Sequence, residues 1–362
     1  MAKPSAPRLA LTPDRDVPGD LDARLLAFVR RELGDPAIGY AEPPSRILGG
    51  FDTLIYGFRL AGAPAGFSGP LILRVFRAGV EREQALYEAA VQNAVADLDF
   101  PAPRVLLTHT EADPLGAAFT IMERMPGTVM LNKLLGPAMA RMPLLLARTH
   151  ARLHALDASE FIQRLKGAGA RLEPMSVDAL VDQHERRITA AKLTGLRPAL
   201  GWLASRRPAI PDGVSICHGD FHPLNVLVDD DCVTGVVDWG WVMVGPAEYD
   251  VGAAVALFTQ GPVNVPGFVY PLVGVIRRWL VRRYLVAYAK LRPLDLEAMR
   301  YFEGLRLMQF LIEAGEAAQG GAGVMARSVQ SLPFGQPRVQ RGIITRVRQI
   351  TGERASLPPA SG

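Results

Sequence analysis

Residues 216–240, ICHGDFHPLNVLVDDDCVTGVVDWG, place clusters of polar side chains at the ends of short apolar runs. The runs on either side of the acidic triplet 229–231 are apolar and rich in valine, a pattern that predicts a β-hairpin with the triplet at its tip. Such a hairpin returns Asp238 to the neighbourhood of Asn225. The sequence therefore predicts two oxygen-bearing side chains near each other at the open end of a hairpin.

These residue types suit phosphoryl transfer. Carboxylate and amide oxygens are hard ligands that Mg²⁺ accepts while it keeps other positions for water and substrate phosphates. Asp220, five residues before Asn225, could accept a proton from a hydroxyl nucleophile while the metal holds the phosphate. We therefore expect Asp220 to be catalytic, and Asn225 and Asp238 to be the metal ligands.

The same stretch resembles the aminoglycoside phosphotransferase family, small-molecule kinases that share the protein-kinase fold. The matching residues, in chain order, are His218-Gly219-Asp220, Asn225, Asp238-Trp239-Gly240, Pro246 and Asp250. Protein kinases have H-R-D at the same spacing from asparagine, so the glycine after His218 favours the small-molecule branch. The resemblance implies ATP, or another nucleoside triphosphate, and Mg²⁺ as cofactors, and a small hydroxylated molecule as the acceptor.

The rest of the chain fits an α+β, protein-kinase-like fold with two lobes. Alternating and helical apolar patterns predict a small antiparallel sheet with one inserted helix, residues 80–98, followed by a larger, mainly helical lobe. The predicted divisions are a flexible N-terminal arm at 1–20, an N-lobe at 21–126, a C-lobe at 127–330 and a basic, peripheral C-terminal tail at 331–362.

A kinase-like N-lobe needs a glycine-bearing loop over the phosphates and a cation on its third strand. Gly49 and Gly50, between two predicted strands, are the candidates for the loop. No lysine lies in the predicted sheet, so the cation must be an arginine or be missing. A strand period of two places Ile72 and Arg74 on one face, which would put Ile72 against adenine and Arg74 against the phosphates. Arginine occurs here within the resembled family, but it departs from the lysine pattern, and the two cations are not interchangeable.

The resemblance also suggests two further parts of the nucleotide site. Three glutamates of the following helix could orient the arginine: Glu81, Glu83 and Glu88. We choose Glu83, because EREQALYEAA resembles the Arg-Glu start of this helix in the family. The stretch TIMERMPG resembles the hinge between the lobes, where backbone groups near Glu123 and Met125 would hydrogen-bond adenine.

Other histidines and a second aspartate have less direct roles. His150 and His154 are four residues apart on a predicted helix, a spacing able to bind zinc, but no third ligand is apparent and packing is expected. His222 could either contact the phosphate or metal or support the loop, and the sequence does not decide between these two roles. We expect His218 and Asp250 to hold the catalytic loop in place.

The sequence does not identify the molecule that accepts the phosphoryl group. A polycationic aminoglycoside would need an acidic pocket in the C-lobe, for which the candidates are Asp295, Glu297, Glu303, Glu313 and Glu316. Arginines are at least as numerous over residues 271–306, so macrolides, sugars and other hydroxylated metabolites are equally compatible.

Three alternatives to a small-molecule kinase were weighed. A protein kinase is disfavoured because Pro246 follows Asp238 within eight residues, which leaves no room for an extended activation segment. A pseudokinase is disfavoured because Asp220, Asn225 and Asp238 are all present. A nucleic-acid-binding module is disfavoured because a net charge of +4 comes without a long basic run.

No membrane segment or secretion signal is expected. Residues 268–289 are apolar but have four arginines in their middle, which favours a buried helix of a soluble protein. The N-terminal segment is interrupted by prolines and charges. Cys217 and Cys232 lack CxxC spacing and are expected to be small buried residues, so a cytoplasmic location is predicted.

Overall fold

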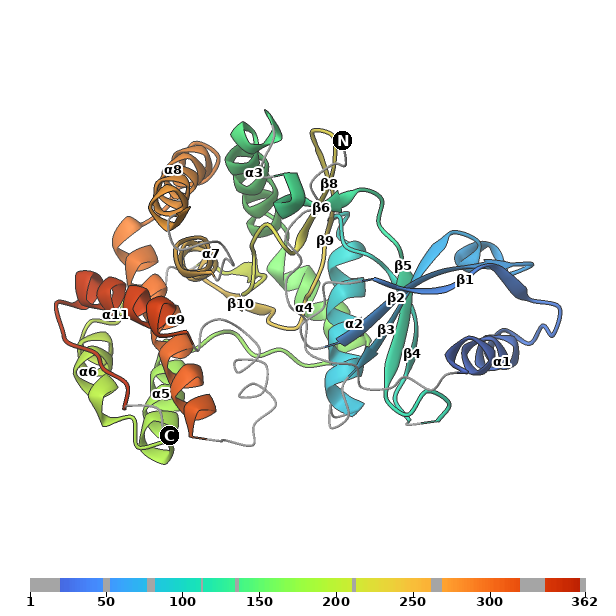
Figure 1. The fold of residues 1–362 in the computed structure, drawn as a ribbon, viewed down its shortest axis with the longest axis horizontal. Coiled ribbons are helices and arrows are strands. Elements are labelled where there is room, and N and C mark those ends of the chain that lie inside the picture. The colour runs from blue at the N-terminus through green and yellow to red at the C-terminus, as the bar shows by residue number, and fades with distance from the viewer. Residues whose placement is uncertain are drawn as a thin grey trace.

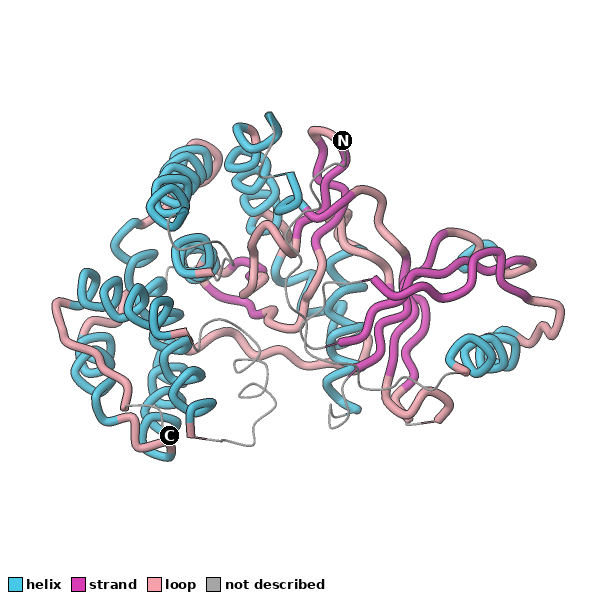
Figure 2. The backbone as a smooth tube through the Cα atoms, viewed as in Figure 1, coloured by secondary structure: helices cyan, strands magenta, loops and turns pink. Residues whose placement is uncertain are grey.

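A computed structural model describes most of the chain, in eight segments. These are residues 20–47, 53–76, 82–111, 113–133, 137–209, 213–261, 269–319 and 336–358. A β-sheet lobe and a mainly helical lobe are plain in the ribbon, with about the first third of the chain forming the sheet lobe (Figure 1). The tube view shows the large sheet on one side of the molecule with two helices beside it, most of the other helices toward the opposite side, and shorter strands between (Figure 2). The predicted α+β, two-lobed fold is confirmed.

The N-lobe contains one five-stranded antiparallel sheet of order β1-β2-β3-β5-β4. Its elements are α1 (Leu21–Leu33), β1 (Gly39–Ile47), β2 (Thr53–Ala61), the 3₁₀ turn η1 (Ala65–Phe67), β3 (Pro70–Phe76), α2 (Arg82–Ala96), β4 (Val105–His109) and β5 (Phe119–Glu123). In β3, Leu71, Leu73 and Val75 are buried on one face, whereas Ile72 and Arg74 are half-buried on the other. The predicted alternation is confirmed, and α2 is the inserted helix.

The C-lobe begins with a short strand, 3₁₀ turns and four helices: β6 (Thr128–Val129), η2 (Met130–Lys133), η3 (Pro137–Ala140), α3 (Met142–His154), α4 (Ala158–Gly167), α5 (Val177–Ala190), η4 (Thr194–Leu196) and α6 (Arg197–Ser205). Four short strands follow: β7 (Ser215–Cys217), β8 (Val226–Asp229), β9 (Cys232–Val236) and β10 (Met243–Gly245). The last helices are α7 (Ala247–Gln260), α8 (Tyr270–Ala289), α9 (Leu296–Ala318) and α11 (Pro337–Thr351). The short strands form two small sheets, β10-β7 and β6-β8-β9, and the predicted polar segment runs through both of them.

Helix α7 is the central helix of this lobe. It is buried on almost every side and packs closely against α9. A Cβ added at Gly252 would come within 2.6 Å of the Met299 carbonyl oxygen, so the two helices cross at a separation that only glycine allows. This crossing fixes the position of α9 relative to the strands that precede α7.

Two expectations about the carboxyl half are wrong. Helix α8 was expected to be buried, but only Leu280, Tyr284 and Tyr288 along it are buried. Among the described residues, no helix combines the length and the apolar character that a bilayer-spanning segment needs. The tail was expected to be peripheral, but α11 buries Ile343 and Val347 against the apolar cluster of α5, α6 and α9.

Candidate active site

The β8–β9 hairpin forms as the sequence predicts. Val226 pairs with Val236, and the backbone N–H of Val237 donates to the Asn225 carbonyl oxygen at 2.9 Å. Asp238 is therefore the first residue after Val237, which makes the last hydrogen bond of the hairpin. Cys232, expected to be buried, is exposed because it lies beside the hairpin tip, and both cysteines are free.

The loop before the hairpin is held by Asp250. Its carboxylate accepts the backbone N–H groups of His218 at 2.5 Å and Gly219 at 2.9 Å. His218 is buried, and its Nε2 lies 3.1 Å from the Val237 carbonyl oxygen. The expected loop-holding roles of His218 and Asp250 are confirmed.

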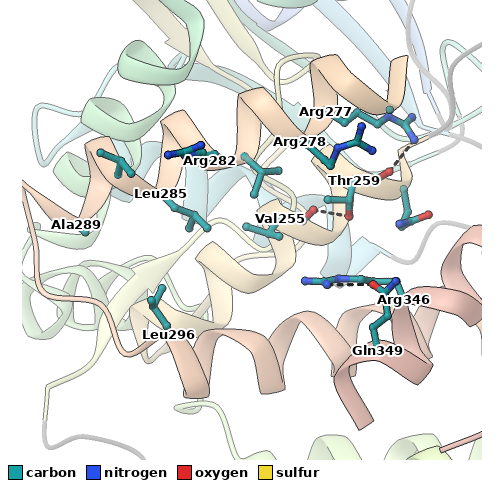
Figure 3. Close-up of a pocket in the computed structure, with 14 residues that line it drawn as sticks. Val255, Thr259, Arg277, Arg278, Arg282, Leu285, Ala289, Leu296, Arg346 and Gln349 are labelled. Atoms are coloured by element: carbon teal, nitrogen blue, oxygen red, sulfur yellow. Dashed lines mark hydrogen bonds between the residues drawn. The ribbon is translucent and has the colours of Figure 1, made fainter. Parts of the chain in front are cut away.

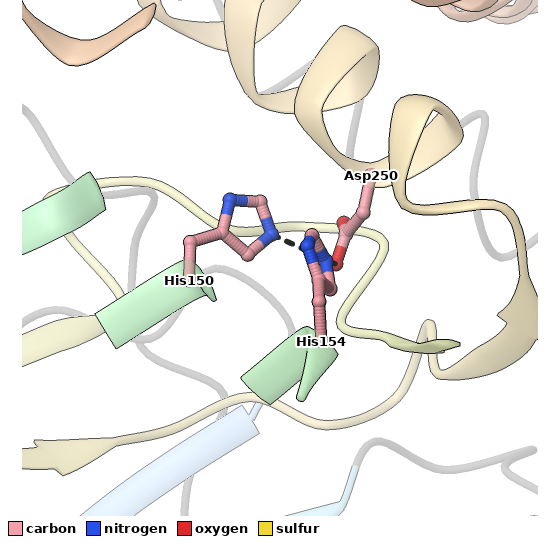
Figure 4. A group of neighbouring side chains, drawn as sticks. All are labelled: His150, His154 and Asp250. Atoms are coloured by element: carbon pink, nitrogen blue, oxygen red, sulfur yellow. Dashed lines mark hydrogen bonds and ion pairs between the residues drawn. The ribbon is translucent and has the colours of Figure 1, made fainter. Parts of the chain in front are cut away.

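Asp250 is itself surrounded by side chains of α3 (Figure 4). His154 Nε2 bonds its Oδ2 at 3.2 Å, and His150 Nε2 approaches the same oxygen at 2.9 Å without hydrogen-bond alignment. Their Nδ1 atoms each lie 2.6 Å from a tyrosine hydroxyl of α8, Tyr284 and Tyr288. Asp250 is thus a third possible metal ligand beside the two histidines, which sequence analysis did not identify. One ligand atom from each of the three residues lies within 4.8 Å of the others, close enough to bind a metal ion.

Hydrogen bonds satisfy Asp250 and His154 in this cluster, whereas His150 Nε2 has no aligned partner among the described residues. Burial alone would raise the pKa of Asp250, but His150 and His154 hold it well below its usual range. Burial and the neighbouring His150 lower the pKa of His154 to about 4, so this imidazole is neutral at pH 7. A carboxylate that accepts two backbone N–H groups and an imidazole N–H is satisfied as an ion. Both histidines are buried, as the expected packing role requires, but the expectation that no third ligand is present is wrong.

Asp220 lies on the loop that Asp250 supports, with three side-chain partners. Its Oδ1 accepts Arg306 Nη2 at 3.3 Å, and its Oδ2 lies 3.2 Å from His222 Nε2 and 3.0 Å from Asn225 Nδ2. Burial alone would raise the pKa of Asp220, but His222 and Arg306 hold it well below its usual range. The carboxylate is therefore ionised at neutral pH, and His222, which the sequence left open, contacts it directly.

Asn225 and Asp238 fit the requirements of a divalent cation. Asn225 uses Nδ2 to donate to Asp220, and its Oδ1 accepts from no described residue. The side chain of Asp238 is accessible to solvent, but many protein atoms lie around it. Their exclusion of water raises the pKa of Asp238. Arg74 counteracts this rise, whereas the charges of Asp220 and Glu88 add to it. A cation would relieve this concentration of negative charge.

Arg74 has a different partner from the one predicted. Its Nη1 lies 2.7 Å from Glu88 Oε2, and the two side chains are 19% and 9% exposed. Glu83 lies in the exposed first turn of α2, so the prediction of Glu83 is wrong. A Cβ at Gly240 would come within 3.2 Å of Glu88 Oε1, which places the ion pair beside the segment that follows Asp238.

The remaining nucleotide-site predictions are only partly described. Gly49 and Gly50 lie outside the described residues. The backbone N–H of Glu123 donates to the Arg104 carbonyl oxygen at 2.9 Å, so this N–H is not available to adenine. The Met125 N–H donates to no other described residue, which suits the predicted hinge role. Ile72 lies on the same face of β3 as the phosphate-side arginine.

Four of the five acidic residues proposed for an acceptor pocket already have local roles. Asp295 caps the N-terminus of α9, and Glu303 forms a bidentate ion pair with Arg346 of α11, both distances being 2.7 Å. Glu316 is bidentate with Arg187 of α5 at 2.9 and 2.7 Å. Glu313 accepts from Gln309, and burial raises its pKa. Only Glu297, exposed in the first turn of α9, has no side-chain partner among the described residues.

Sequence reasoning missed Arg306. This arginine reaches Asp220 from α9 across 86 residues of chain. The only sequence signal was a charged residue inside a mostly apolar run of α9, GLRLMQFLI. Such a residue is costly to bury unless it has a partner, and its partner here is the predicted catalytic carboxylate.

A cavity of about 760 Å³ lies apart from the catalytic loop, between α7, α8, α9 and α11 (Figure 3). None of its lining residues belongs to that loop. Two of its arginines are already engaged, since Arg277 donates to the Thr259 carbonyl oxygen at 2.7 Å and Arg346 pairs with Glu303. We therefore place the active site at Asp220 rather than in this cavity.

Curated relatives cover parts of the chain. Acyl-CoA dehydrogenase family member 11 of Gallus gallus is 27% identical over 220 residues, which are 58% of this chain and 28% of that protein. The chain thus spans roughly a quarter of that relative's length. The aminoglycoside 3'-phosphotransferase of Streptomyces fradiae is 29% identical over 209 residues, 52% of this chain and 76% of that protein.

Solved structures share the fold. A thermostable mutant of aminoglycoside phosphotransferase APH(4)-Ia has a TM-score of 0.59 at 16% identity, covering 90% of this chain and 99% of the other. Macrolide 2'-phosphotransferase from Brachybacterium faecium has a TM-score of 0.55 at 20% identity, covering 88% and 99%. The model of the phosphotransferase enzyme family named APH matches residues 46–294, more than half of the sequence. This match establishes that the chain belongs to the APH phosphotransferase enzyme family.

Proposed function

We propose that the chain transfers the γ-phosphoryl group of ATP to a hydroxyl group of a small molecule. The observation that supports this best is an ionised Asp220 in direct contact with Asn225, with Asp238 at the end of the same hairpin. Family membership agrees with this chemistry. A thermostable mutant of APH(4)-Ia, which has the same fold at 18% identity, forms a ternary complex with ADP and hygromycin B.

Each residue has a role that follows from its surroundings. Asp220 would accept the acceptor's hydroxyl proton or orient the hydroxyl, because it is held ionised beside the loop. Arg74, fixed by Glu88, would hold the nucleotide phosphates. Asn225 Oδ1 and the Asp238 carboxylate would hold Mg²⁺, which when bound neutralises phosphate charge. Catalysis would then consist of positioning and charge neutralisation.

The alternatives have less support. Only eight residues separate Asp238 from the start of α7 at Ala247, so an extended activation segment of the protein-kinase type has no place there. A pseudokinase would not need Asp220 to be held ionised between His222 and Arg306. No nucleic acid is expected as a partner. The cytoplasmic location remains a prediction.

Turnover and nucleotide binding separate these functions. We would measure ADP release from ATP and Mg²⁺ with a panel of hydroxylated small molecules, for the native protein and for Asp220→Asn. We expect kcat to fall about 10²- to 10⁴-fold with nucleotide binding retained. Asp229→Asn, at the exposed hairpin tip, is the matched control and should turn over normally. Nucleotide binding without turnover of any acceptor would favour the pseudokinase.

A further inference from the structure

The environment of Arg306 differs from that of the other charged residues on α9. The side chain is 5% exposed, and its guanidinium group lies over the rings of Trp241 at 5.3 Å and Phe310 at 5.0 Å. Its Nη1 donates to Gln309 at 2.9 Å and its Nη2 to Asp220 at 3.3 Å. Its Nε is buried and donates to no described residue. A buried guanidinium with an unused donor and a single long contact to a carboxylate is incompletely paired.

Productive binding of a hydroxyl would bring the acceptor against this arrangement. In the structure Oδ2 of Asp220 contacts His222 and Asn225, whereas Oδ1 contacts Arg306 alone. A carboxylate oxygen can accept two hydrogen bonds, so Oδ1 has one left for an acceptor hydroxyl. That hydroxyl would then lie beside the guanidinium group of Arg306.

The guanidinium group has an unpaired donor to offer that acceptor. Its buried Nε has no partner among the described residues, and an unsatisfied buried donor is costly. Glu313 lies near Arg306, but the hydrogen bonds between them run through Gln309. A planar guanidinium between two rings presents its edge to a partner, and a carboxylate fits that edge with two parallel hydrogen bonds.

We propose, on the basis of the phosphotransferase function above, that Arg306 binds the acceptor and that the acceptor is a hydroxy acid, with a carboxylate near the hydroxyl that receives the phosphoryl group. Arg306 would use its unpaired Nε–H to bind the carboxylate of the acceptor beside Asp220. The same charge disfavours polycationic acceptors, and the acidic side chains of α9 that could have attracted them are mostly paired or capping.

Matched acids and amides test the charge requirement. The acceptors are ω-hydroxycarboxylates of three to six carbons and the corresponding hydroxyamides, with kanamycin as a polycation, each assayed with ATP and Mg²⁺. We expect the native protein to prefer the best acid over its amide by at least about 100-fold in kcat/KM. Arg306→Gln should lose this preference mainly by slowing the acid, and Arg306→Lys should be intermediate. Arg300→Gln, exposed on the same helix, is the control and should behave as the native protein.

A binding measurement tests the hydroxy-acid site at Arg306 separately from the proposed phosphotransferase activity. Trp241 lies against Arg306, so a bound carboxylate should change tryptophan fluorescence in the presence of a non-hydrolysable ATP analogue, and Arg306→Gln should abolish that change. Arginine-dependent binding without phosphorylation of any acceptor would contradict the proposed function but support the hydroxy-acid site. Equal kcat/KM for acids and amides, a preference for kanamycin, or an equal loss on all acceptors in Arg306→Gln would overturn the inference.

Discussion

The glycine between His218 and Asp220 is required by the backbone. Gly219 has a φ of +75°, and a Cβ there would come within 2.3 Å of the Trp241 carbonyl oxygen. An arginine, as in the protein-kinase H-R-D motif, could not occupy this position without moving the segment after Asp238. The difference from protein kinases that the sequence indicated thus has a steric cause.

Replacing this glycine should disturb both stability and catalysis. We expect Gly219→Ala to cost about 1–3 kcal/mol of unfolding free energy. We also expect kcat/KM to fall at least about 100-fold, because the loop that positions Asp220 must shift. Chemical denaturation and steady-state kinetics would measure the two effects. Gly201→Ala, where an added Cβ meets nothing within 4 Å, is the control. Native-like kinetics in Gly219→Ala would contradict the steric argument.

Two single substitutions, one at Glu88 and one at Glu83, test which glutamate is the partner of Arg74. Glu88→Gln keeps the shape of the side chain but removes its charge from a largely buried ion pair. We expect a loss of about 1.5–3 kcal/mol in transition-state binding, or about 10- to 100-fold in kcat/KM for ATP. Glu83→Gln should leave the kinetics unchanged, because Glu83 is exposed. A larger effect from Glu83→Gln would restore the original prediction.

At the scale of elements, α11 is an integral helix of the C-lobe. Its apolar positions Ile343 and Val347 are fully buried against the neighbouring helices, and Arg346 pairs with Glu303 of α9. Residues 331–362 looked peripheral because their apolar residues are few and interspersed with arginines. Helical spacing nevertheless places those few on one face, and the partner face exists only in the folded lobe.

We therefore expect substitutions in α11 to destabilise the protein. Ile343→Ala should lower the unfolding free energy by about 2–5 kcal/mol, because it removes a fully buried side chain. Arg348→Ala, exposed on the same helix, should change it by no more than about 0.5 kcal/mol. Equilibrium unfolding in urea measures both. Equal stability of the two variants would show that α11 does not contribute to the core.

At the scale of the whole molecule, buried histidines link stability to pH. His184 of α5 is 3% exposed, and burial, with a contribution from Arg187, lowers its pKa to about 4. Its ordinary value is 6.5, so the unfolded chain binds a proton first as the pH falls. The unfolding free energy should therefore decrease between pH 6.5 and 4, by up to about 1.4 kcal/mol per pH unit from this residue. His154 has the same direction of shift.

The test is the slope of stability against pH. His184→Gln should reduce the loss of unfolding free energy between pH 6.5 and 4, even if the variant is less stable at pH 7. Between pH 7 and 8 the two proteins should show the same slope, which serves as the internal control. An unchanged slope below pH 6.5 in the variant would exclude His184 as a source of the pH dependence.

Local sequence was sufficient for the hairpin and for the order of the secondary structure. The valine-rich runs flanking residues 229–231 specify the hairpin. Asp238 then returns close to Asn225, because the strands pair along their length with one register shift, between Leu227 and Val228. The alternation in β3 likewise placed Arg74 on the face away from the apolar core. These features depend on residues close together in the chain.

The sequence by itself thus determined the family resemblance, the two-lobed fold and the hairpin that brings Asp238 back toward Asn225. Tertiary structure alone decided that Glu88 rather than Glu83 meets Arg74, and that Arg306 meets Asp220. The reason is physical: the rotation of α2 and the placement of α9 result from many weak apolar contacts made together. No short stretch of sequence contains that sum, whereas a hairpin or a turn is set by its own few residues.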